Sequence, residues 1–200
     1  MKRVVLTGGP CSGKTTTLSA LQEEFGEQIL IVPEVATMLL EGGFPVPGKD
    51  VTWSELWQSA FQAAVLPLQK SFEDAFALKC GDGDNRLLIS DRGILDGAAY
   101  TPGGVAEFAR LYNVDVTAAL TRYQAIIHLE SLAVCDPSKY GKTGNKTRFE
   151  PLERAVELEQ STKHVWQHHP HRVIIDGRRG IDGKIAQVIG IVRFLLCETS

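Results

Sequence analysis

The octapeptide GGPCSGKT occupies residues 8–15, directly after the apolar run Val4-Val5-Leu6. Its spacing, G-x-x-x-x-G-K-T, is that of a P-loop, in which glycines let successive backbone N–H groups turn inward around an anion. We predict that this loop binds nucleotide phosphates, with Lys14 reaching the β- and γ-phosphates and the Thr15 hydroxyl binding Mg²⁺. The predicted nucleotide-binding residues of the loop are Gly8, Gly9, Pro10, Cys11, Ser12, Gly13, Lys14, Thr15 and Thr16.

The residues on both sides of the loop supply the context that a P-loop needs. Residues 2–7 end in a β-branched apolar run, which indicates a buried strand. Residues 15–25 place apolar side chains three or four positions apart, the spacing of a helix. The positive end of that helix, near Gly13, would point at the same phosphates.

Five short apolar runs indicate buried strands, and helical patterns separate them. This alternation predicts an α/β fold, with a five-stranded, mostly parallel sheet covered by helices on both faces. We expect a single domain over residues 1–200, because this length with 44% hydrophobic content suits one sizeable core. Residues that act on a ligand should lie at the carboxyl ends of the strands. The predicted strands are Val4 to Leu6, Ile29 to Val32, Leu87 to Ile89, Ala125 to Leu129 and Val173 to Ile175.

Composition and charge argue against several classes of protein. A formal net charge of −3, with acidic and basic residues interspersed, gives no broad electrostatic footprint for nucleic acid. The four cysteines form no CxxC pair, which disfavours a zinc knuckle and fits a reducing compartment. The first strand begins too soon after Met1 for a secretory leader, and the apolar residues 188–197 are too few to span a bilayer. We therefore expect a cytoplasmic protein without a transmembrane segment.

The longest helical pattern covers residues 52–79, and Thr52 to Glu55 has the form of a capping box. Most of its apolar residues are expected to pack in the core. Trp53 and Trp57, near the helix start and the preceding glycine- and proline-containing residues 42–48, are candidates for lining a pocket.

Residues 131–150 follow the fourth predicted strand and lack sustained periodicity. They are rich in glycine, serine, aspartate and lysine, which is typical of a mobile lid. The segment carries the cations Lys139, Lys142, Lys146 and Arg148, which could close over phosphates or simply form a solvated basic loop.

Charged residues follow two other predicted strands. Asp91 ends the run Leu87-Leu88-Ile89-Ser90, where a carboxylate can reach the shell of a Mg²⁺ ion, and Arg92 can bind an anionic group bidentately. Glu34 follows the second strand, where a carboxylate facing the γ-phosphate could act as a general base. These positions predict a phosphate site with Thr15 and Asp91 as its metal ligands.

The segment LISDRGILDGAAY, residues 88–100, resembles the Asp-Arg segment of thymidylate kinases and, more loosely, the Glu-Arg-Ser segment of deoxynucleoside kinases. That resemblance implies that Arg92 helps to hold the substrates' phosphates. Gly93 departs from the pattern, which has an aromatic residue or serine there. Glu34 falls where deoxynucleoside kinases place a Pro-Glu whose carboxylate orients or deprotonates the acceptor hydroxyl.

The order of motifs over most of the chain resembles the small AAA-type ATP-binding domain family. The motifs are GGPCSGKTT, VPEVA, SDRG, IIHL, residues 145–150, WQHHP and IID. The resemblance implies a P-loop NTPase of nucleoside- or nucleotide-kinase type. It also implies that Arg148 contacts the transferring phosphate and that Arg178 and Arg179 lie near the nucleotide base. Relatives include ribosylnicotinamide-kinase-like domains and the nucleotide-binding part of an animal regulator that binds GTP and phosphatidic acid.

Two functional hypotheses follow, both with Mg²⁺ as cofactor and ATP or GTP as co-substrate. The first is a kinase-like phosphotransferase acting on a nucleoside, a nucleotide or a similar small molecule. The second is a nucleotide-hydrolysing switch that binds a protein partner or an anionic lipid. No guanine-specifying Asn-Lys-x-Asp string occurs, which disfavours Ras-like GTP recognition. The candidate catalytic residues are Lys14, Glu34, Asp91, Arg92 and Arg148.

Overall fold

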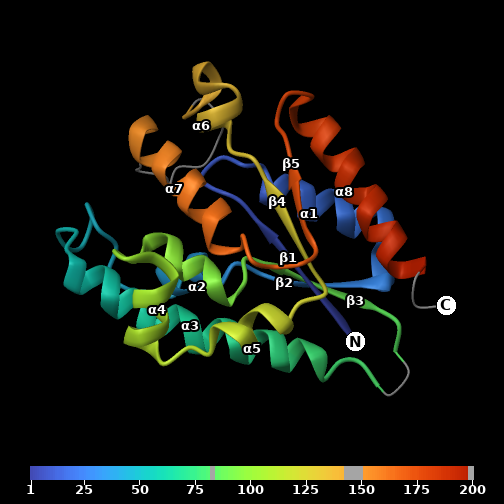
Figure 1. The fold of residues 1–200 in the computed structure, drawn as a ribbon, viewed down its shortest axis with the longest axis horizontal. Helices are drawn as coiled ribbons and strands as arrows, with labels where there is room; N and C mark the ends of the chain where they lie inside the picture. The colour runs from blue at the N-terminus through green and yellow to red at the C-terminus, as the bar shows by residue number, and fades with distance from the viewer. Residues whose placement is uncertain (82–83, 142–150, 198–200) are drawn as a thin grey trace.

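The computed structural model describes residues 1–81, 84–141 and 151–197, in which a five-stranded sheet lies between two layers of helices (Figure 1). The strand order is β2-β3-β1-β4-β5 and every neighbouring pair is parallel. The strands are β1 (Lys2–Thr7), β2 (Ile29–Val32), β3 (Leu87–Asp91), β4 (Ala125–Leu129) and β5 (Arg172–Ile175). The predicted α/β architecture with a parallel sheet is confirmed.

The helices connect consecutive strands, as parallel pairing requires. The α-helices are α1 (Lys14–Phe25), α2 (Val35–Glu41), α3 (Glu55–Ala77), α4 (Gly104–Tyr112), α5 (Val116–Thr121), α6 (Leu132–Cys135), α7 (Leu152–Val165) and α8 (Gly180–Cys197). The part of the chain that the structure describes also contains the 3₁₀ helices η1 (Gly26–Gln28), η2 (Ile94–Tyr100) and η3 (Pro137–Lys139).

Alternation along the central strand explains why helices cover both faces. Val4 and Leu6 of β1 point to one face, where they pack with buried apolar residues of α1 and α8. Val5 points to the other face, where it joins a second core that contains Phe108 of α4 and Trp166, which follows α7. A continuous apolar run therefore forms the central strand, because both of its faces are buried.

The structure differs from the predicted boundaries in small but informative ways. The strand β3 runs to Asp91, two residues beyond the predicted end at Ile89, so this carboxylate is the last residue of the strand. The long helix begins at Glu55, and Ser54 caps it by accepting a hydrogen bond from the N–H of Trp57. The prediction of a cap at Thr52 was wrong, because a serine two residues later makes the capping bond.

Parallel pairing brings the carboxyl ends of the central strands to one edge of the sheet. Leu6 of β1 lies opposite Asp91 of β3, and Thr7 lies opposite His128 of β4. The connection from β1 to α1 leaves the sheet at this edge, and α6 lies beyond it in Figure 1. The P-loop and the ends of β3 and β4 therefore meet, as the strand order requires.

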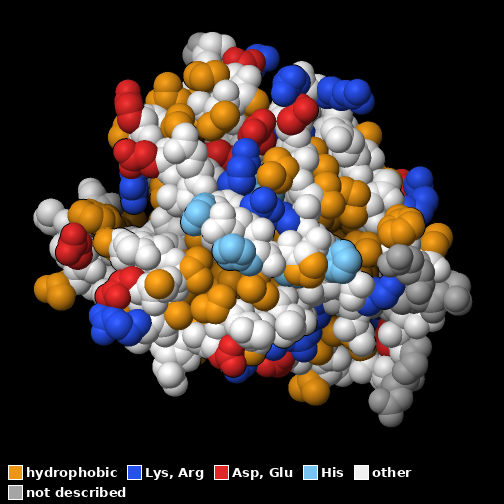
Figure 2. Space-filling view, viewed as in Figure 1, with side chains coloured by type: hydrophobic (Ala, Val, Ile, Leu, Met, Phe, Trp, Pro, Cys, Tyr) orange, Lys and Arg blue, Asp and Glu red, His pale blue; other side chains and the backbone are white. Residues whose placement is uncertain are grey.

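Acidic and basic side chains are interspersed on the face seen in Figure 2, without a broad field of one sign. Among the described residues, no helix has both the length and the apolar character needed to cross a bilayer.

Replacing Leu21 with alanine tests the packing of α1 on the sheet. Leu21 is fully buried in the first core, so Leu21→Ala should lower the free energy of unfolding by about 2–5 kcal/mol. The matched control is Leu78→Ala, since Leu78 is exposed at the end of α3, and its effect should stay within about 0.5 kcal/mol. Urea denaturation measures both, and equal effects would contradict the core assignment.

Candidate functional site

The P-loop combines three positive φ values within six residues, and this gives it the shape of an anion-binding nest. Gly8 has φ +148°, Cys11 has φ +58° and Gly13 has φ +91°. A Cβ on Gly8 would lie 2.2 Å from the carbonyl oxygen of Leu129, so this position accepts only glycine without rearrangement. The loop ends where α1 begins at Lys14, as predicted.

The carbonyl oxygens of the loop are bound by neighbouring elements. The Ser131 hydroxyl, at the start of α6, donates to the carbonyl of Pro10. The N–H of Leu132 donates to the carbonyl of Cys11 over 3.3 Å. The Lys184 ammonium of α8 donates to the carbonyl of Ser12 over 3.0 Å. Because these carbonyls are held outward, the N–H groups of the same peptides can face a phosphate.

A buried carboxylate supports the loop from α7. Glu159 Oε2 accepts from the N–H of Gly9 over 2.8 Å, and its Oε1 lies 2.7 Å from Nε2 of His128. Burial would raise the pKa of Glu159, but the hydrogen bond and charge of His128 lower it overall. Sequence reasoning missed Glu159 and Lys184, because each reaches the loop from a helix far along the chain.

Lys14 is the first residue of α1, and its side chain is buried. Its positive charge lowers the pKa of both Glu34 and Asp91, so these two carboxyl groups share its electrostatic environment. Thr15 and Thr16 are exposed at the start of the helix. Their hydroxyls are therefore open to a ligand.

Asp91 is buried at the end of β3, and its Oδ1 atom has no hydrogen-bond partner. Burial raises the pKa of this carboxyl to about 6, and the negative charge of Glu34 adds to the rise, while Lys14 opposes it. A buried carboxylate oxygen without a partner fits a hard cation such as Mg²⁺, which takes oxygen ligands.

Mg²⁺ is usually held by one or two protein oxygen ligands together with substrate phosphates and water. Within the described residues, no group of three or more His, Cys, Asp or Glu side chains could hold a metal ion alone. Asp91 and the exposed Thr15 could each supply one oxygen ligand of this kind.

Arg92 and Glu34 form an ion pair beside the P-loop. Arg92 Nε donates to Glu34 Oε1 over 2.6 Å, and the Thr37 hydroxyl donates to Glu34 Oε2 over 2.6 Å. Burial opposes the ionisation of Glu34, but the charges of Arg92 and Lys14 and the hydrogen bond from Thr37 lower its pKa to about 2. Glu34 is therefore a carboxylate at neutral pH.

The backbone of Arg92 is in the left-handed region, with φ +72°, which side chains other than glycine seldom adopt. Its N–H donates to the carbonyl of Leu6, and its own carbonyl accepts from the Gln69 amide. Nη1 of Arg92 lies 3.6 Å from Asp96 and 3.4 Å from the carbonyl of Gly8. In this backbone conformation, the guanidinium of Arg92 lies next to the loop.

Asp96 is a structural acid that sequence reasoning missed. It is buried and accepts hydrogen bonds from the Thr7 hydroxyl, from the N–H of Gly93 over 2.8 Å and from Nε1 of Trp166 over 3.2 Å. Trp166 also explains why glycine follows Arg92, since a Cβ on Gly93 would lie 2.8 Å from the indole ring. The tryptophan occupies the space that a larger residue at this position would need.

The other predicted cations are exposed or lie outside the described residues. Arg178 and Arg179 are exposed in the connection from β5 to α8, and Arg178 pairs with Asp176 at 3.9 Å. Arg148 lies outside the described residues, as do Lys142 and Lys146. The described start of the predicted lid forms α6 and η3, where Lys139 pairs with Asp136 at 2.8 Å.

The two tryptophans considered for a pocket behave differently. Trp57 stacks on Phe61 with ring centroids 4.9 Å apart, and its Nε1 donates to the carbonyl of Pro45 over 2.8 Å. Its packing contacts are thus with its own helix and the preceding loop. Trp53 is exposed and lines an open hollow with residues 48–52.

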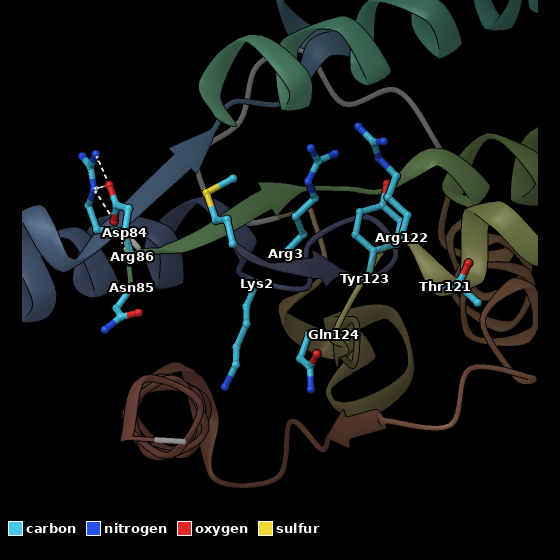
Figure 3. A pocket seen from close by; sticks show the side chains of 10 residues that line it. Lys2, Arg3, Asp84, Asn85, Arg86, Thr121, Arg122, Tyr123 and Gln124 are labelled. Atoms are coloured by element: carbon cyan, nitrogen blue, oxygen red, sulfur yellow. Dashed lines mark hydrogen bonds and ion pairs between the residues drawn. The ribbon is translucent and has the colours of Figure 1, made fainter. Parts of the chain in front are cut away.

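A cavity of about 320 Å³ lies at the amino ends of β1, β3 and β4 (Figure 3). Its cations already have partners, since Arg86 lies 2.6 Å from Asp84, and Arg122 lies 2.6 Å from Glu73. The P-loop follows the carboxyl end of β1, so this cavity lies at the other end of the strands and is separate from the phosphate site. Its lining residues are Met1, Lys2, Arg3, Asp84, Asn85, Arg86, Thr121, Arg122, Tyr123 and Gln124.

Comparisons with known proteins agree with this geometry. The structure is similar to that of deoxyadenosine kinase from M. mycoides with bound dATP, with a TM-score of 0.66 and 13% sequence identity. The match covers 96% of this chain and 100% of that chain. A search of curated proteins gave no significant match. A family model described as AAA domain matches residues 3–183. The chain therefore belongs to this AAA domain family, as a nucleotide-binding P-loop protein with a kinase-like fold.

Proposed function

We propose that this protein is a Mg²⁺-dependent phosphotransferase that moves the γ-phosphoryl group of ATP to a nucleoside, a nucleotide or a similar small molecule. The observation that carries the proposal is the Arg92–Glu34 ion pair in the electrostatic environment of Lys14. The pair supports the proposal because an ionised carboxylate can accept a hydrogen bond from an acceptor hydroxyl, while an arginine can bind an anionic group of a substrate.

Lys14 and the N–H groups of the loop would hold the β- and γ-phosphates, while Thr15 and Asp91 would hold Mg²⁺. When bound with the nucleotide, this ion supplies charge neutralisation on the phosphates. Asp91 fits that role because its unpartnered oxygen is already desolvated at the end of β3. Positioning and charge neutralisation would provide most of the catalysis.

Glu34 would orient the acceptor hydroxyl and accept its proton as phosphoryl transfer proceeds. A carboxylate with a pKa near 2 is a weak base, so its main contribution is the alignment of the hydroxyl by a hydrogen bond. Arg92 holds the Glu34 carboxylate through Nε, and its Nη1 lies near Asp96 and the carbonyl of Gly8, so Nη2 would bind an anionic group of a substrate. The pair thus combines acceptor alignment with phosphate binding.

The remaining predicted cations complete the proposed site. Arg148, within a lid formed by residues 131–150, would contact the transferring phosphate. Arg178 and Arg179 would lie beside the nucleotide base. The exposure of both arginines at the carboxyl end of β5 leaves them accessible to such a ligand.

A second candidate function is a nucleotide-dependent switch that binds a protein partner or an anionic lipid. At the start of α3, Leu56 is 84% exposed and Trp53 is 56% exposed. Exposed apolar side chains that lie together can form a surface for binding a partner. In this case, partner affinity would differ between the triphosphate and diphosphate states, and acceptor molecules would not change turnover. Measuring partner affinity and turnover with ATP and then with GTP would also determine the nucleotide preference.

Lys14→Ala should abolish nucleotide binding or turnover, because the loop then lacks the ammonium that reaches the β- and γ-phosphates. Isothermal titration with Mg·ATP measures the loss. Lys70→Ala is the control, since Lys70 is exposed on α3. Wild-type turnover in the Lys14 variant would contradict the assignment of the site.

Glu34→Gln should reduce turnover by about 100-fold or more, because the amide neither aligns the acceptor hydroxyl as the carboxylate does nor accepts its proton, while ATP affinity should change little. Glu41→Gln is the matched control, because Glu41 is exposed at the end of the same helix. Initial rates and nucleotide titrations separate the two effects. Equal activity of both variants would remove the proposed role of Glu34.

Asp91→Asn should stabilise the ligand-free protein above pH 6 while weakening its response to Mg²⁺. The raised pKa means that the folded protein retains a proton on Asp91 between pH 4 and 6 that the unfolded chain has lost, so stability falls as pH rises through about 6. Asparagine avoids this cost, which is about 3 kcal/mol. Chemical denaturation in EDTA at pH 5 and pH 8 tests the prediction, and a gain that is larger at pH 5 would oppose it.

A further inference from the structure

The contacts behind the P-loop assign a binding role to Lys184 of α8. We infer that its ammonium is a positioning group for the phosphate site, which it serves by fixing and polarising the peptide between Ser12 and Gly13. The inference rests on the proposed function only to the extent that the loop is the phosphate site. Lys14 would contact the phosphates directly, whereas Lys184 would act on them only through the backbone of the loop.

Lys184 links three strand ends that meet at the loop. Its side chain is 2% exposed, and Nζ donates to the carbonyl of Ser12 over 3.0 Å and also to the carbonyl of Glu130. Ser12 lies in the loop after β1, Glu130 directly follows β4, and α8 follows β5. One ammonium therefore fixes the loop against the adjacent part of the sheet.

The geometry of the peptide between Ser12 and Gly13 transmits the effect of the Lys184 hydrogen bond to the N–H group that would face the phosphate. The carbonyl of Ser12 and the N–H of Gly13 belong to one planar trans peptide, so they point in opposite directions. Holding the carbonyl on Lys184 turns the N–H away from α8. A cationic donor on the carbonyl also polarises the peptide and makes that N–H a stronger donor to an anion.

The first turn of α8 contacts the same peptide at a second point. A Cβ on Gly13 would lie 2.5 Å from Cδ1 of Ile181, three residues before Lys184. Ile181 thus packs against the Cα of Gly13 while Lys184 binds the preceding carbonyl. These two contacts define both the position and the orientation of the peptide.

An ammonium is a costly way to fill this space, because burial disfavours its charged form. Burial lowers the pKa of Lys184, and Cys135 together with the carboxylates of Glu159, Glu130 and Asp176 opposes that effect. A methionine of similar shape would avoid the cost of burying a charge. A contribution of the Lys184 charge to anion binding would explain why the site has a lysine rather than an uncharged residue.

The test compares the wild-type protein with Lys184→Met by calorimetric titration with tripolyphosphate and with ATP, both with Mg²⁺. Loss of a buried, charge-assisted hydrogen bond should weaken both affinities by roughly 10- to 100-fold. The thermal midpoint should also fall, because the carbonyls of Ser12 and Glu130 lose this donor, so the titrations are made well below the midpoint, where the variant is folded. A residue with only a structural role would lower the midpoint and leave the affinity of the folded fraction unchanged.

Lys2→Met is the matched control. Lys2 Nζ also donates to a backbone carbonyl, that of Leu195 near the other end of α8, over 3.1 Å. This variant should bind both probes within twofold of the wild type. Lys184→Gln, which keeps an N–H donor without the charge, should bind with an affinity between those of the wild type and Lys184→Met.

The outcomes separate this inference from the proposed function. Wild-type affinity in Lys184→Met would overturn the inference, and if that variant does not fold, wild-type affinity in Lys184→Gln would overturn it instead. Failure of the wild-type protein itself to bind tripolyphosphate and ATP would overturn the phosphate site on which the proposed function depends.

Discussion

The site depends on one constraint. A loop that binds an anion through its N–H groups must point its carbonyl oxygens away from that anion. Buried carbonyls need hydrogen-bond donors, because an unpaired one costs about 1–3 kcal/mol. Here the donors come from the Ser131 hydroxyl, the Leu132 amide and the Lys184 ammonium. The chain thus uses α6 and α8, the helices that follow β4 and β5, to shape a loop that follows β1.

A second consequence of this arrangement is electrostatic. The parallel order β3-β1-β4 places Asp91, Arg92 and the P-loop at one edge, and Glu34 reaches the same place from the end of β2. Burial keeps the pKa of Asp91 high, while the cations keep the pKa of Glu34 low. Near pH 6, Glu34 is therefore ionised while Asp91 still holds a proton in part of the molecules, and binding of a cation would favour the ionised form of Asp91.

Sequence patterns predicted the parts of the fold that depend on local order. The P-loop, the five strands and the alternation with helices all follow from periodicity and from glycine spacing, and the structure confirms them. The Glu34–Arg92 pair was predicted only as two separate positions, since 58 residues separate its members. Glu159 and Lys184 gave no local signal, because an ordinary helical glutamate or lysine acquires its role only through a distant backbone group. Likewise, the glycine after Arg92 departs from the kinase pattern for a reason, the nearby Trp166, that tertiary packing alone reveals.

Phosphorus NMR of the protein with Mg·ATP and a panel of nucleosides and nucleotides tests the central claim most directly. Phosphoryl transfer predicts that ADP appears together with a new phosphate ester of a nucleoside acceptor or a new phosphoanhydride of a nucleotide acceptor, in equal amounts and without inorganic phosphate as the main product. Slow release of inorganic phosphate that is the same with and without every acceptor would contradict the account and favour a nucleotide-dependent switch.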